Sequence, residues 1–134
     1  MRIQSINPVN GKILETYKEE TEKNIAIKIE KSQKAWLEWR ETSFKQRATL
    51  LKNAATVLRA NKNNLALIMA NEMGKPLAAG VTEIEKCATV CDYYATNGEK
   101  YLHDQLVATD AKKSFISFQP IGVVLAVMPW NFPF

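Results

Sequence analysis

The chain has 134 residues, of which 46% are hydrophobic and 24% charged, and its formal net charge is +4. This length and composition predict a single globular domain. The lysines are spread among glutamates, which disfavours a nucleic-acid surface. The sequence contains neither a secretory leader nor an apolar run of about 20 residues, so we expect a cytoplasmic protein without a membrane span.

The amino-terminal part predicts a β-hairpin followed by a helix. Residues 3–17 contain two short strand-like stretches around Asn-Pro and Asn-Gly dipeptides, which favour turns. Thr21 is the predicted N-cap of the first helix, which should end near residue 40. Its apolar positions fall near one face, and we expect that face to pack in the core: Ile25, Ile29, Trp36, Leu37 and Trp39.

Three further helices are predicted in the middle of the chain. The sequence 43–46, SFKQ, is a capping box that starts the second helix, and the polar residues 61–64 should end it. The third helix should stop at Gly74, a typical left-handed cap before a proline. The fourth is expected over residues 78–97, with Gly98 closing it. Together these helices predict a small bundle.

The carboxy-terminal part predicts two strands and a turn. Residues 114–119 form the first strand, and the uncharged run 122–127 suits a strand buried in a parallel sheet. Pro129 ends that strand. Trp130 and Asn131 follow its carboxyl end, where open α/β sheets bind ligands. A neutral amide at that place can stabilise a developing oxyanion; the alternative is that Asn131 merely caps a turn.

Several of these segments resemble one enzyme family. Residues 129–133 resemble the PWNFP signature of the aldehyde dehydrogenase superfamily. Residues 72–76 resemble its E-x-G-K-P element, to which we assign no chemistry beyond stopping a helix. The opening hairpin is also similar, although Asn10 stands where threonine is usual. The resemblance runs from end to end, and residues 73–94 and 125–134 are most similar to bacterial succinate-semialdehyde dehydrogenases.

The resemblance implies an α/β fold of which this chain forms the amino-terminal part. We expect a β-hairpin, four helices, an oligomerisation-arm strand and the first buried strand of the cofactor-binding sheet, mostly helical as the chain stands. Residues 1–134 would be a partial cofactor-binding domain that includes part of the arm, about residues 107–120. The resemblance implies that the catalytic domain is absent from this sequence.

The resemblance also implies a function for the complete protein. It would oxidise a small aldehyde, expected to be succinate semialdehyde, to the carboxylate with NAD or NADP, as a homo-oligomer (a dimer or tetramer). Asn131 would stabilise the oxyanion, and Met128, Pro129 and Trp130 would border the cofactor. The nucleophilic cysteine, the glutamate base and the cofactor lysine have no counterpart in this sequence, so we expect the 134-residue chain alone to be inactive.

The two cysteines do not match the nucleophile of the family. Cys87 and Cys91 are spaced i,i+4 and lie outside the family's G-Q-x-C setting. We interpret them as small core thiols, with a redox pair as the alternative. A metal site would need more ligands, and His103 is the one histidine, so we predict no metal site.

The alternative functions are an aldehyde dehydrogenase of different specificity and a non-catalytic helical interaction module.

Overall fold

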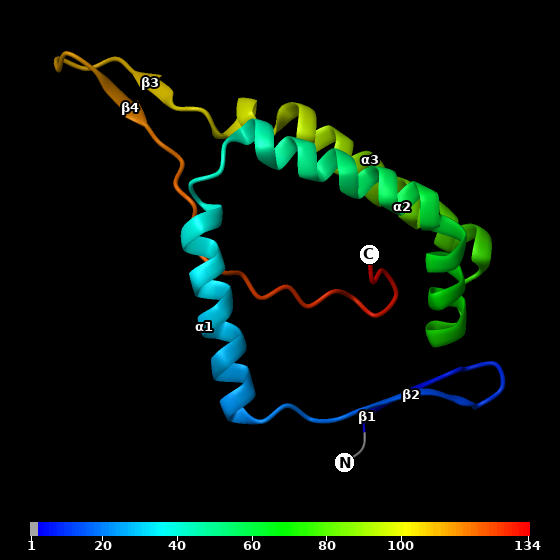
Figure 1. The fold of residues 1–134 in the computed structure, drawn as a ribbon. Coiled ribbons are helices and arrows are strands. Elements are labelled where there is room, and N and C mark those ends of the chain that lie inside the picture. The colour runs from blue at the N-terminus through cyan, green and yellow to red at the C-terminus, as the bar shows by residue number, and fades with distance from the viewer. Residues whose placement is uncertain (1–2) are drawn as a thin grey trace.

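The computed structural model of the protein describes residues 3–134, and this part of the chain is mostly helical (Figure 1). Two separate antiparallel hairpins, β1–β2 and β3–β4, accompany three helices. The elements in chain order are β1 (Ile3–Ile6), β2 (Ile13–Tyr17), α1 (Glu22–Trp39), α2 (Phe44–Met73), α3 (Leu77–Leu102), β3 (Gln105–Val107) and β4 (Ser114–Ile116). The predicted number of four helices is therefore wrong.

The predicted amino-terminal hairpin is confirmed, and it is attached to the end of α2. Ile3 pairs with Tyr17 and Ile6 with Ile13. Asn7 stabilises the turn that follows β1, because its carboxamide oxygen accepts a hydrogen bond from the Val9 amide at 2.9 Å. The same carboxamide donates to Asn71 of α2 at 3.4 Å. This contact places β1 beside the last turn of α2.

The first helix has the predicted start, but its apolar face is not in a core. The Thr21 side chain accepts from the Asn24 amide at 3.2 Å, as an N-cap should. No residue of α1 is buried, and Ile29 is 62% exposed. Figure 1 shows α1 standing apart from the other two helices. The expected core packing of the α1 face is therefore wrong, because within residues 3–134 no element covers it.

The second and third predicted helices are one continuous helix, α2. It begins at the predicted capping box, in which the Ser43 hydroxyl accepts from the Gln46 amide and Gln46 reaches back to the Ser43 amide. The polar residues 61–64 do not interrupt it. The Asn61 side chain bonds the Val57 carbonyl within the helix at 2.8 Å, while the apolar face continues past this point. Gly74 ends α2 in the left-handed conformation, as predicted.

The core is the contact between α2 and α3, which run antiparallel side by side (Figure 1). Its buried centre consists of Ala66, Met69 and Ile84. The predicted bundle is thus a helix pair. The fourth predicted helix, α3, continues through Gly98 to Leu102, supported by a hydroxyl contact between Tyr93 and Tyr101. One glycine inside a helix costs only about 1 kcal/mol, so Gly98 does not stop it.

Gly80 allows this close helix contact, and its substitution gives a first prediction. A Cβ at residue 80 would lie 2.9 Å from the Ala66 Cβ and 3.1 Å from its Cα. Gly80→Ala should therefore push the helices apart and lower the free energy of unfolding by about 1–3 kcal/mol, measured by urea unfolding. Gly98→Ala is the matched control: nothing lies within 4 Å of that position, and alanine there should stabilise the helix by about 0.5–1 kcal/mol. Equal effects at both positions would contradict the packing argument.

The carboxy-terminal region has a shorter arm strand than expected and lacks the predicted buried strand. β4 ends at Ile116, and it pairs with β3, a strand that the sequence did not predict. The segment 122–127 is not a strand, and its side chains are exposed, with Leu125 at 89% and Val127 at 83%. A parallel strand needs neighbours for its backbone groups. Within the described chain this segment has none.

Candidate functional site

The residues that the sequence singled out form an exposed turn at residues 129–132. The Phe132 amide donates to the Pro129 carbonyl at 3.1 Å, which places Trp130 and Asn131 at the centre of the turn. Met128 is 53% exposed and Trp130 77% exposed. The four predicted site residues are therefore consecutive on one accessible loop, although the strand that was expected to present them is not formed.

The carboxamide of Asn131 is exposed to solvent. Within residues 3–134 its side chain has no hydrogen-bond partner, and the residue is exposed. The hydrogen bond that closes the turn joins two backbone atoms, the Phe132 nitrogen and the Pro129 oxygen. The backbone carbonyl of Asn131, by contrast, accepts a hydrogen bond from the Lys75 ammonium at 2.8 Å. Residue 131 thus combines a fixed backbone with an available amide donor.

A buried ion pair, Lys75 with Glu83, holds this turn against the helices. The two side chains are only 10% and 5% exposed. The Glu83 carboxylate also accepts from the Phe134 amide at 3.3 Å. The Lys75 ammonium lies 4.1 Å from the centre of the Phe132 ring, within the range of a cation–π contact.

Sequence reasoning missed this pair. The sequence assigns Lys75, within the segment 72–76, no role beyond stopping a helix, and it assigns Glu83 no role. A signal did exist. Glu83 adjoins Ile84 and follows Gly80 by three positions, so it lies near the buried face of α3. A charged residue on such a face rarely occurs without a partner.

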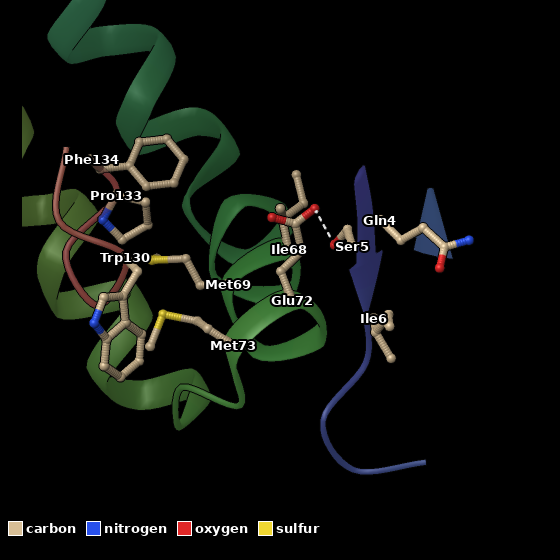
Figure 2. Close-up of a pocket in the computed structure, with 10 residues that line it drawn as sticks. All are labelled: Gln4, Ser5, Ile6, Ile68, Met69, Glu72, Met73, Trp130, Pro133 and Phe134. Atoms are coloured by element: carbon tan, nitrogen blue, oxygen red, sulfur yellow. Dashed lines mark hydrogen bonds between the residues drawn. The ribbon is translucent and has the colours of Figure 1, made fainter. Parts of the chain in front are cut away.

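One groove borders the turn on the side of α2. It has a volume of about 740 Å³ and is lined by the end of α2, by β1 and by the carboxy-terminal residues. Figure 2 shows Trp130 and Pro133 on the same side as Met69 and Met73, with Ser5 of β1 opposite. Ser5 donates to the Glu72 carboxylate at 3.1 Å. The groove is therefore apolar around the tryptophan and polar at the hairpin.

A second groove, of about 760 Å³, borders the turn on the side of α3. Phe132 and Phe134 line it together with Lys75, Cys87 and Cys91. Both thiols are free, and burial is the main cause that raises the pKa of Cys87. A raised pKa disfavours the thiolate that a nucleophile or metal ligand needs. Both cysteines are only partly buried and line this groove, outside the buried centre of the helix pair, so the predicted core position of the two thiols is wrong.

Residues 3–134 contain neither a cluster of metal ligands nor a membrane-spanning helix. No three histidine, cysteine, aspartate or glutamate side chains in this part of the chain come together as metal ligands. In the same part, every helix is too short or too polar to cross a membrane.

Comparison with known sequences gives a match over the whole chain. The pattern of the Aldehyde dehydrogenase family matches residues 1–134. A Synechocystis protein named probable succinate-semialdehyde dehydrogenase, NADP(+), is 42% identical over 134 residues, which is 100% of this chain and 30% of that protein. A Mycobacterium leprae protein named succinate-semialdehyde dehydrogenase, NADP(+), is 39% identical over 99% of this chain and 30% of its own length.

Solved structures agree with the sequence match. Succinic semialdehyde dehydrogenase from Streptococcus pyogenes, in complex with NADP+, superposes with a TM-score of 0.90 at 32% identity over 97% of this chain and 29% of that one. Succinate-semialdehyde dehydrogenase from Burkholderia pseudomallei superposes with a TM-score of 0.88 at 33% identity, over 99% of this chain and 28% of that one. The chain thus spans about 30% of the length of the relatives it matches. Given the match to the family pattern over all of residues 1–134, the chain belongs to the aldehyde dehydrogenase family.

Proposed function

We propose that this chain forms the amino-terminal part of an NADP-dependent aldehyde dehydrogenase that oxidises succinate semialdehyde. In that enzyme the α2–α3 pair would cover the cofactor-binding domain, and the β3–β4 hairpin would belong to the arm that contacts another subunit. Both curated relatives described above carry names with this substrate and this cofactor. The chain would supply one group that acts on the reacting atoms, Asn131.

The observation that carries the proposal is the exposed carboxamide of Asn131 on a turn with a fixed backbone. An oxyanion site requires a donor that is already oriented before charge develops. The carbonyl of the same residue is bound by Lys75 at 2.8 Å, whereas the carboxamide binds nothing within the described residues. A neutral amide also leaves the site without an added charge that would have to be desolvated.

Met128, Pro129 and Trp130 would border the cofactor. Met128 and Trp130 expose apolar side chains beside Asn131, a surface that suits one side of a planar ring. These three residues would form one border of the cofactor site. When bound, NADP would accept the hydride that leaves the substrate.

A hybrid enzyme tests the proposal. Residues 1–134 would replace the matched segment of the Synechocystis relative, and NADPH formation would be followed with succinate semialdehyde and with butanal, which lacks the distal carboxylate. We expect turnover by the hybrid, a preference for succinate semialdehyde, and no turnover by the 134-residue chain alone. A folded hybrid that is inactive beside an active parent would contradict the proposal.

The alternative function is a helical module that docks onto a complete dehydrogenase subunit. The observation in its favour is the exposed apolar face of α1, where Trp39 is 46% exposed. Native co-purification distinguishes the two. The enzyme proposal expects the hybrid to be active without any added subunit. The alternative requires that a complete dehydrogenase subunit stay bound to the 134-residue chain during purification under native conditions.

A further inference from the structure

We infer that Lys75 and Glu83 are positioning residues for Asn131, acting as a clamp that fixes the turn on which its carboxamide is presented. The inference rests on the proposed function of Asn131. It assigns a role to two residues that lie outside the PWNFP segment, and neither of them is required to touch substrate or cofactor.

Lys75 holds the residue that carries the donor. Its ammonium binds the carbonyl of Asn131 at 2.8 Å, so the contact acts on the backbone and leaves the carboxamide available. The same ammonium lies 4.1 Å from the ring centre of Phe132. Two consecutive residues of the turn are therefore fixed by one cation, which restricts rotation of the peptide that links them.

Glu83 is the second residue of the clamp and contacts the turn from α3. Its carboxylate pairs with Lys75 through one oxygen and accepts from the Phe134 amide through the other, at 3.3 Å. Residues 131, 132 and 134 are thus all attached to a single ion pair, which is held by α3 and by the segment between α2 and α3. These contacts attach the turn to the helix pair.

Stability alone is a weak reason for this arrangement. Removing two charges from water costs several kcal/mol, and a buried ion pair often contributes no more than a well-packed apolar pair. The defined geometry of such a pair is its distinctive property. A carboxamide that must lie within hydrogen-bond distance of a developing oxyanion depends on that geometry, because a displacement of about 1 Å can cost up to about 100-fold in rate.

The first test measures the turn directly in the 134-residue protein. Lys75→Met combined with Glu83→Gln removes the cation and its counter-charge together, so no unpaired charge remains buried. Amide hydrogen exchange of Phe132, measured by NMR, should become at least about 10-fold faster, which corresponds to the loss of one hydrogen bond from a charged donor. Lys86→Met is the matched control, since Lys86 lines the same groove and, within residues 3–134, forms no hydrogen bond or ion pair with the turn. Exchange at Phe132 that is equally fast in the unsubstituted protein and the double variant would overturn the inference.

The second test measures catalysis in the hybrid enzyme. The double variant should lower kcat about 10-fold while the KM for NADP and the melting temperature stay close to those of the hybrid. A purely structural role would lower the melting temperature and leave kcat unchanged. Asn131→Ala in the same hybrid separates the two proposals. If Asn131→Ala is slow and the double variant is not, the clamp fails alone; if Asn131→Ala keeps its rate, the oxyanion role fails.

Discussion

Asn131→Ala should lower kcat/KM of the hybrid enzyme by about 100-fold or more, which is the loss expected when one preorganised oxyanion donor is removed. The structure gives a second expectation that makes this result interpretable. Because the Asn131 side chain is exposed and makes no hydrogen bond within residues 3–134, its truncation should leave the free energy of unfolding unchanged. The paired measurement is a rate assay beside urea unfolding of the same protein.

An isosteric variant sharpens this prediction. Asn131→Asp keeps the shape of the side chain but replaces the N–H donors by a carboxylate, which would repel a developing oxyanion. It should be at least as slow as Asn131→Ala. Rates within a few-fold of the unsubstituted hybrid for both variants would instead support the interpretation that Asn131 only occupies a turn.

The features predicted correctly from the sequence have causes that lie within a few residues. Thr21 caps α1, residues 43–46 form the capping box of α2, and Gly74 ends α2 with positive φ. Each depends on a side chain or a backbone preference that acts over at most one helical turn. The polar stretch 61–64 was misjudged because its residues also match exposed positions of a continuing helix.

The features that could not be predicted depend on distant partners. The run 122–127 has the composition of a buried strand, yet strand formation needs neighbours that residues 3–134 do not supply. Lys75 and Glu83 are eight positions apart, and Lys75 meets Asn131 across 56 positions. The place of Glu83 beside Ile84 indicates that this carboxylate needs a partner, but nothing in the sequence identifies Lys75 as that partner or connects the pair to Asn131. Asn131 could therefore be singled out from the sequence, whereas the contacts around it could not.

Glu83→Ala should cause the largest loss of stability in this chain. It would leave the Lys75 ammonium, whose side chain is 10% exposed, without its counter-charge, and the Phe134 amide without its acceptor. Breaking one side of a buried ion pair costs about 3–5 kcal/mol, mostly because the remaining charge stays desolvated. Urea unfolding followed by helical circular dichroism should show this loss.

Glu85→Ala is the matched control for that measurement. Glu85 is also on α3 and binds Lys62 at 2.6 Å, and the hydrogen bond from Lys62 holds its pKa below the ordinary value. Its side chain is 38% exposed, so water can replace the lost partner and the effect should be much smaller. The double variant Lys75→Met with Glu83→Leu should recover most of the stability lost in Glu83→Ala, because it removes both charges. This variant can also separate the contribution of the pair to stability from its effect on the turn. Apolar contact can replace the stabilising energy of the pair, but it cannot replace the hydrogen bond from Lys75 to the backbone of Asn131. Stability should therefore recover while the Phe132 amide stays unprotected from exchange. If Lys75→Met with Glu83→Leu stays as unstable as Glu83→Ala, the loss of stability comes from packing around Glu83 and not from an unpaired charge.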